Sequence, residues 1–199
     1  MVASVDYRMA PEHHFPAAVE DAWAAIEWAA AQDYAAMAVG GDSAGGNLAA
    51  VMALRARDRG RPRLALQLLV YPVTDHDFET ESYRTNADGY VLTRDGMRWY
   101  WDHYVPDVSQ RAHPEASPLR AESLKGVAPA VVLTVEYDPL RDEGEAYAER
   151  LAQAGVPVVC RRYDGLVHGA YRWPGKVDRS WQMLDDSAAA LRSAFALED

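Results

Sequence analysis

The sequence has 199 residues, of which 49% are hydrophobic and 25% are charged, the balance of a soluble globular domain with a sizeable core. Its formal net charge is −10 and its Lys and Arg residues are scattered, which argues against a nucleic-acid-binding protein. Cys160 is the only cysteine, so an internal disulfide and a cysteine-rich metal site are both excluded.

The first part of the chain alternates short apolar segments with helical patterns. Residues 2–7 are predicted to form a strand. After Pro16, apolar residues recur at spacings of three and four, which predicts an amphipathic helix containing Val19, Ala22, Trp23, Ile26, Ala29 and Ala30. A short strand is predicted over 37–40 and a second helix over 44–57.

Three almost unbroken apolar runs follow, at residues 64–71, 130–135 and 156–160. Strands that are apolar on both faces are typical of a parallel sheet covered by helices on each side. A helix that ends at Gly155 separates the last two runs, and a final helix is predicted over 178–196. The alternation of strand and helix therefore predicts α/β architecture with a mainly parallel sheet flanked by helices.

The segment from about residue 74 to 126 interrupts this alternation. It is long, non-repetitive and rich in Trp, Tyr, Asp and Pro. We interpret it as an insertion within a single domain of residues 1–199, lying over one edge of the sheet, because long connections in compact domains are usually lids or binding loops. A solvent-exposed irregular excursion is the alternative.

Residues 40–47 read Gly-Gly-Asp-Ser-Ala-Gly-Gly-Asn and contain the pattern G-x-S-x-G around Ser43. The pattern lies between a predicted strand and a predicted helix, which is the setting of a nucleophile elbow. A serine on so sharp a turn requires small neighbours, which are present at Gly41, Ala44, Gly45 and Gly46. The helix N-terminus also directs N–H groups at developing negative charge. A glycine-rich turn with an incidental serine is the alternative.

A serine hydroxyl becomes a nucleophile when a base takes its proton, and the usual base is a His oriented by a carboxylate. In open α/β sheets such groups follow the carboxyl ends of strands. The run 130–135 is followed by two candidate acids, Asp138 and Asp142, and the run 156–160 leads to His168. Hydrolases with a nucleophile elbow carry the serine, the acid and the histidine in this chain order. The sequence has the same order, with Ser43 first, then Asp138 or Asp142, and His168 last.

The other five histidines do not fit this order, and we interpret them as surface or loop residues: His13, His14, His76, His103 and His113. No pair of them has metal-ligand spacing with carboxylate support, so no metal site is expected.

Four motifs together resemble those of the hormone-sensitive-lipase-like esterases, also called bacterial family IV or α/β-hydrolase fold-3 carboxylesterases. The motifs are Tyr-Arg-Met-Ala-Pro-Glu with Phe-Pro-Ala-Ala in 7–18, the elbow in 41–47, Asp-Pro-Leu-Arg-Asp-Glu-Gly in 138–144, and His168-Gly169. The resemblance runs from Val2 to the last predicted helix. It implies the α/β-hydrolase fold and a serine carboxylic ester hydrolase that acts on small acyl esters through an acyl-enzyme, without a cofactor.

The resemblance also assigns roles to residues near the elbow. It selects Asp138 as the catalytic acid and leaves Asp142 to pair with Arg141 or the loop backbone. The N–H of Ala44 is expected in the oxyanion hole, and Asp42 and Asn47 are expected to brace the elbow. Candidates for the acyl or alcohol pocket are Tyr90, Trp99, Trp101, Tyr104, Leu166 and Val167. For the two tryptophans, packing of the insertion onto the sheet is the alternative.

One family motif has no counterpart here. The family carries a His-Gly-Gly-Gly stretch upstream of the segment matched by residues 7–12, and its N–H groups supply most of the oxyanion hole. The only His-Gly pair in this sequence is His168-Gly169, so we expect the chain to begin at the family's fourth strand. A catalytically silent or weakly active truncated fragment is therefore one alternative, and a serine peptidase of the same fold is another.

The same departure has a consequence for partners. In this fold the third strand lies between the fourth and the fifth, so an open strand edge is expected at 37–40. An open edge invites pairing with another chain, and we expect a homo-oligomer or a partner that supplies a strand.

The location of the protein is inferred from weak signals. No apolar run approaches the length of a membrane span, and the first residues lack a signal-peptide pattern. We expect a cytoplasmic protein with no membrane partner. Cys160 lies in an apolar run, so its thiol is expected to be buried and inert.

Overall fold

The computed structural model describes residues 1–196. Its centre is a parallel sheet whose four strands lie in chain order. They are β1 (Ala38–Asp42), β2 (Leu66–Val70), β3 (Ala130–Tyr137) and β4 (Val158–Val167). Every neighbouring pair is parallel. The observed sheet confirms the predicted α/β architecture.

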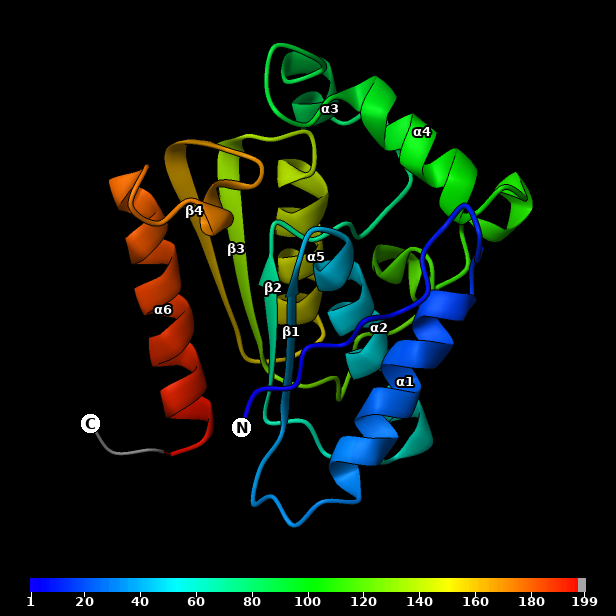
Figure 1. The fold of residues 1–199 in the computed structure, drawn as a ribbon, viewed down its shortest axis with the longest axis vertical. Helices are drawn as coiled ribbons and strands as arrows, with labels where there is room; N and C mark the ends of the chain where they lie inside the picture. Colours follow the sequence, from blue (N-terminus) through cyan, green and yellow to red (C-terminus); the bar gives the residue numbers. More distant parts are fainter. Residues whose placement is uncertain (197–199) are drawn as a thin grey trace.

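Helices cover both faces of this sheet. The four that do so are α1 (Ala17–Ala30), α2 (Ala44–Arg59), α5 (Arg141–Gln153) and α6 (Asp178–Ala194), and the insertion holds α3 (Glu81–Thr85) and α4 (Arg94–Tyr104). Short 3-10 turns are η1 (Val108–Gln110), η2 (Pro118–Arg120) and η3 (Ala170–Arg172). Figure 1 shows α1, α2 and α5 on one face of the sheet and α6 on the other.

The buried strands alternate their side chains between these two helical layers. Leu69 and Val132 pack with α1, α2 and α5, whereas Leu68 and Leu133 pack on the α6 side. Because successive residues of a strand point to opposite faces, both faces must be apolar. This two-sided burial explains the unbroken apolar runs at 64–71 and 130–135.

Residues 2–7 form no strand, so that prediction was wrong. Within residues 1–196, β1 pairs with β2 alone, and no strand lies beyond β1 for this segment to join. A segment without a neighbouring strand has no ladder for its N–H and C=O groups. It runs as an irregular chain toward α1, with Tyr7 packed against the core.

The insertion is ordered and packs on the rest of the molecule. It contains α3 and α4, which Figure 1 shows above the carboxyl ends of the strands. Its buried side chains form a cluster with residues on either side of it: Val73, Tyr83, Met97, Trp101, Val105, Ala116 and Leu140. A solvent-exposed excursion, the alternative considered from the sequence, is therefore wrong.

Cys160 is exposed, contrary to the prediction of a buried thiol. It lies on β4, the last strand of the sheet, where most side chains are incompletely covered by helices. Partial desolvation, with the nearby Glu145 carboxylate, raises the pKa of this thiol to about 11. The thiol is therefore reachable but stays protonated near neutral pH.

Within residues 1–196, none of the helices combines the length and apolarity that crossing a bilayer requires.

Candidate active site

Ser43 lies on the turn between β1 and α2, in a backbone conformation that serine rarely adopts. Its φ is 56° and its ψ is −118°. Such a conformation costs about 1–3 kcal/mol and persists only when its surroundings impose it. Here the Ser43 N–H donates to the Val70 carbonyl at 2.9 Å, and the Ser43 carbonyl accepts from the Asn47 N–H at 3.0 Å. The turn is thus fixed by both the neighbouring strand and the helix that follows.

The glycines beside Ser43 differ in how much space they leave. A Cβ on Gly41 would lie 2.4 Å from the Gly45 carbonyl carbon, and one on Gly46 would lie 2.9 Å from Pro72 Cβ. Strand and helix therefore approach so closely that only glycine fits at Gly41 and Gly46. A Cβ on Gly45 would meet nothing within 4 Å, so the predicted need for a small residue there was wrong.

His168 and Asp138 meet Ser43 at the same edge of the sheet. Asp138 directly follows β3 and His168 directly follows β4. His168 Nε2 lies 3.0 Å from Ser43 Oγ, and His168 Nδ1 lies 2.7 Å from Asp138 Oδ2. Asp138 is fully buried and His168 is 8% exposed. The other carboxylate oxygen of Asp138 accepts the Leu140 N–H at 2.9 Å.

This arrangement can move a proton. With the Asp138 carboxylate accepting from Nδ1, the Nε2 atom is left as the acceptor that faces the serine hydroxyl. Ala44, the first residue of α2, has an N–H with no intrahelical acceptor and lines the adjacent cavity. The structure thus brings Ser43, Asp138, His168 and Ala44 together.

Asp42 and Asn47 contact other parts of the site. Asn47 is buried and donates from Nδ2 to the carbonyls of Val73 and Ala116, each at 2.9 Å. Asp42 accepts from Arg172 Nε at 2.8 Å, and Arg172 lies on the turn just after His168. Asn47 therefore fastens the elbow to the residue before the insertion and to Ala116 within it.

Tyr71 is a site residue that the sequence reasoning missed. It follows β2 with a φ of 35°, and its ring lies 4.5 Å from the His168 ring, centroid to centroid. Its hydroxyl donates to Asp42 Oδ2 at 3.4 Å. Burial, with the nearby Asp42 carboxylate, raises the pKa of Tyr71, so the phenol stays neutral. The position of Tyr71 at the end of a predicted strand could have marked it as a candidate site residue. Its contact with His168 could not be read from the sequence.

A cavity of about 660 Å³ opens beside Ser43. Of the pocket residues predicted from the sequence, Trp99, Trp101 and Tyr104 line it. Trp101 is also buried in the core of the insertion, so it packs and lines the cavity at once. Other apolar lining residues were not predicted: Tyr7, Met9, Val91, Leu92, Met97 and Trp173.

Three predicted pocket residues lie elsewhere. Tyr90 stacks on Tyr137 with ring centroids 5.0 Å apart, outside the cavity lining. Leu166 is buried in the core on the α6 side of the sheet, and Val167 is paired with Tyr137 in the strand ladder. None of the three lines the cavity, so these assignments were wrong.

The remaining histidines do not join the Ser43 contacts. His76 Nδ1 lies 3.2 Å from Ser117 Oγ within the insertion. His103 lies on α4, lines the cavity and packs its ring 4.2 Å from Trp99, so it is more than a surface residue. Among residues 1–196, no group of His, Cys, Asp and Glu is arranged to hold a metal ion.

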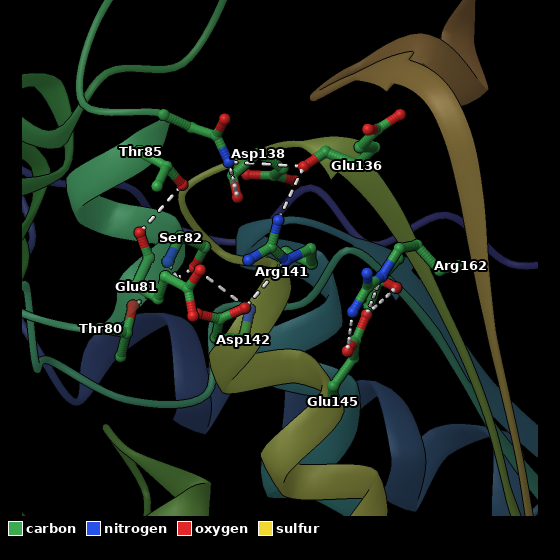
Figure 2. A network of polar contacts seen from close by, with 12 residues as sticks. Thr80, Glu81, Ser82, Thr85, Glu136, Asp138, Arg141, Asp142, Glu145 and Arg162 are labelled. Atoms are coloured by element: carbon green, nitrogen blue, oxygen red, sulfur yellow. Dashed lines mark hydrogen bonds and ion pairs between the residues drawn. The ribbon is translucent and has the colours of Figure 1, made fainter.

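Asp142, the alternative acid, bonds to partners other than His168. Its Oδ1 accepts from Arg141 Nε at 2.8 Å, and its Oδ2 accepts the Ser82 N–H at 2.7 Å. Figure 2 shows these contacts on the side of the acid loop that faces α3. Asp142 thus has the structural role expected of it.

Known proteins share this sequence and fold. Carboxylic ester hydrolase LipN of Mycobacterium tuberculosis is 48% identical over 84% of this chain and 48% of its own length. An arylesterase of Saccharolobus solfataricus is 42% identical over 84% of this chain and 56% of its own length. The chain therefore spans about half the length of these two relatives.

A solved structure agrees in fold. The thermostable carboxylesterase EstE1, cloned from a metagenomic library, superposes with a TM-score of 0.93 at 42% identity, over 96% of this chain and 68% of EstE1. The family described as the alpha/beta hydrolase fold matches residues 1–172. With its parallel sheet and the motifs at residues 41–47 and 138–144, the chain belongs to this family.

Proposed function

We propose that this protein is a serine carboxylic ester hydrolase that acts on small acyl esters. The observation that carries the proposal is the continuous contact from Ser43 Oγ through His168 to the buried Asp138 carboxylate, with distances of 3.0 and 2.7 Å. The strained backbone at Ser43 directs its hydroxyl into the cavity. Strain that the surrounding packing maintains is typical of functional positions.

The mechanism is a two-step acyl transfer. His168 Nε2 takes the proton of Ser43 Oγ as this oxygen attacks the ester carbonyl, and Asp138 stabilises the imidazolium that forms. The proton then passes to the departing alkoxide, which leaves as the alcohol. Water, deprotonated by the same His168, releases the acid and restores the serine.

The negative oxygen of the tetrahedral intermediate requires hydrogen-bond donors. The Ala44 N–H and the start of α2 supply one donor and a favourable dipole. One such donor typically contributes about 10²- to 10³-fold in rate. In the family, the N–H groups of the His-Gly-Gly-Gly stretch complete this site. The rate of this chain therefore depends strongly on whether equivalent donors are supplied.

The relatives support an ester rather than a peptide as substrate. Proteins described as a carboxylic ester hydrolase, an arylesterase and a carboxylesterase share 42–48% identity with the chain. The cavity walls are mainly apolar, contributed by residues such as Met97, Trp99 and Tyr104. Such walls suit the apolar acyl or alcohol group of an uncharged ester.

Hydrolysis of a short p-nitrophenyl ester tests the proposal. The parent chain is expected to show turnover that Ser43→Ala reduces to background, whereas Ser123→Ala, at an exposed serine, keeps the parent rate. A fluorophosphonate probe followed by mass spectrometry should label the parent at Ser43. Equal hydrolysis by parent and Ser43→Ala, without labelling, would instead identify a catalytically silent chain. Preferential cleavage of a peptide p-nitroanilide would favour the peptidase alternative.

Two further expectations accompany this function. We propose a homo-oligomer or a strand-supplying partner at the free edge of β1, which ends the described sheet. A cytoplasmic location stays a prediction from the sequence.

A further inference from the structure

The loop that carries Asp138 is held only in part by its own helix, through Arg141, which donates to the carbonyls of Asp138 and Glu136. We call residues 136–142 the acid loop: they comprise the end of β3, the turn 138–140 and the first residues of α5, whose N-cap residue Leu140 offers no side-chain hydrogen bond. The first N–H groups of a helix lack intrahelical partners and need acceptors from elsewhere. Here an acceptor comes from α3, a helix of the insertion that lies about sixty residues earlier in the chain.

Ser82 of α3 and Asp142 of α5 cap each other's helices. The Ser82 hydroxyl accepts the Asp142 N–H at 3.2 Å and donates to the Pro139 carbonyl at 2.6 Å. In return, Asp142 Oδ2 accepts the Ser82 N–H at 2.7 Å. Figure 2 shows the two residues facing each other between the helices. Ser82 is fully buried, so water cannot replace these bonds.

Asn86, just after α3, holds the other end of the loop. Its Nδ2 donates to the backbone carbonyl of Asp138 at 3.3 Å and to that of Glu136 at 3.4 Å. The side chain is 4% exposed. Ser82 and Asn86 therefore contact the backbone on both sides of the carboxylate that faces His168.

A third contact links the loop to the segment that carries His168. The Glu136 carboxylate accepts the N–H of Gly165, three residues before His168, at 2.6 Å. The acid loop is thus held between α3 on one side and the end of β4 on the other. Displacing α3 would move the carboxylate relative to the imidazole.

We propose that Ser82 and Asn86 are positioning residues that hold Asp138 against His168. This proposal rests on the proposed hydrolase function. The two residues touch neither Ser43 nor His168, and they act through the backbone of the acid loop. Because α3 and the cavity-lining α4 belong to one insertion with a shared buried core, the same segment fixes the acid and shapes the cavity.

Four substitutions in the 199-residue chain separate positioning from general stabilisation. Ser82→Ala and Asn86→Ala each remove contacts to the acid loop. Thr85→Ala is a control within α3, because the Thr85 hydroxyl donates to the Glu81 carbonyl and does not reach the loop. Thr74→Val is the second control: it removes a buried 2.7 Å hydrogen bond to α5, at the Glu143 carbonyl rather than beside Asp138. Thermal unfolding shows which variants fold. If Ser82→Ala does not fold, Asn86→Ala alone tests the proposal.

The readout is the protonation pattern of the His168 ring, which does not require turnover. Long-range proton–nitrogen NMR spectra of the histidine-labelled chain distinguish the two neutral tautomers, with Asp138→Asn assigning the resonance. The parent and both controls are expected to hold the proton on Nδ1, toward Asp138. Ser82→Ala and Asn86→Ala are expected to show a mixture with the Nε2 tautomer.

Kinetics provides the second readout. Loss of alignment without loss of the cavity should lower kcat about 10- to 100-fold and change KM little. A parent-like His168 pattern in both test variants would overturn the proposal, as would the same change in Thr74→Val. If the parent shows the Nδ1 pattern but no turnover that depends on Ser43, the hydrolase function is refuted. The positioning role is then decided by the NMR comparison of the variants alone. A parent without the Nδ1 pattern would overturn both.

Discussion

At the scale of single residues, the conformation of Ser43 depends on the space that two glycines leave. Gly41 faces the backbone of Gly45, and Gly46 faces Pro72, so strand and helix touch directly beneath the nucleophile. A side chain at either position would have to displace backbone rather than a flexible side-chain end. The glycine pattern of the motif is therefore a packing requirement, and it makes Ser43 protrude from the turn.

The closest of these contacts gives a prediction for stability. Gly41→Ala is expected to lower the free energy of unfolding by about 1–3 kcal/mol, because its Cβ overlaps the Gly45 carbonyl. Gly45→Ala is the matched control: its Cβ meets nothing, and alanine in a helix should raise stability by up to about 1 kcal/mol. Urea unfolding of both variants measures the difference. Equal effects of the two substitutions would contradict this account of the turn.

At the scale of elements, one buried arginine joins α1, α2 and the insertion. Arg55 of α2 donates from Nε and an Nη atom to the two carboxylate oxygens of Glu115, at 2.6 and 2.9 Å, and also to Glu20 of α1 at 2.9 Å. Its side chain is 7% exposed. The hydrogen bonds from Arg55 hold the pKa of Glu115 below its usual value.

This pairing predicts a pH-dependent contribution to stability. Arg55→Met is expected to lower the free energy of unfolding by about 1–3 kcal/mol near neutral pH, because Glu115 loses its partner in a partly buried site. Since the pKa of Glu115 is lowered on folding, the pair stabilises fully above the ordinary value of 4.5 and less as pH falls through the folded value. The difference between parent and Arg55→Met should therefore narrow in acid.

Chemical unfolding from neutral to acidic pH checks this prediction. Arg84→Met is the control, because Arg84 is 65% exposed and lies 3.9 Å from Glu79, away from Glu115. Its effect should stay below about 1 kcal/mol. A difference for Arg55→Met that persists undiminished in acid would show that packing, rather than the ion pair, accounts for the loss.

The elements that the sequence predicted well are those with a local signal. The apolar runs 64–71 and 130–135 predicted β2 and β3 because both faces of each strand had to be filled, whereas β4, predicted from the run 156–160, is mostly exposed. The residues that follow β1, β3 and β4 are Ser43, Asp138 and His168. The strand expected at 2–7 failed because a strand also needs a neighbour, which no local pattern reports. The prediction that Cys160 is buried failed for a related reason, because its apolar run lies on β4, an edge strand of the described sheet.

Contacts between distant segments could not be read from the sequence. Ser82 and Asn86 meet the acid loop across more than fifty positions, and neither stands out in its own neighbourhood. The pocket residues show the same limit. Trp99 and Tyr104 share a helix that faces the cavity, whereas Leu166 and Val167 precede His168 but are held within the sheet. Nearness in sequence to a site residue did not determine nearness in space.

At the scale of the whole molecule, two properties oppose each other. The chain carries a formal net charge of −10, which favours separate molecules in solution. Yet β1 pairs on one side only within residues 1–196. The N–H of Ser43 and the carbonyl of Met37 both bond toward β2. By the two-residue period of a strand, the backbone groups of Ala38, Gly40 and Asp42 then point to the free edge.

This free edge predicts self-association that depends on protein concentration. Ala38→Pro removes an N–H that points away from β2, so it should leave the sheet folded and weaken the dimer about fivefold or more. Ala38→Ser keeps the N–H and should associate like the parent. Higher ionic strength should strengthen association in both, because it screens the repulsion between acidic molecules. Sedimentation velocity over a range of concentrations and salt measures these effects. A parent that stays monomeric throughout, or an Ala38→Pro variant that associates as strongly as Ala38→Ser, would place the contact elsewhere or remove it.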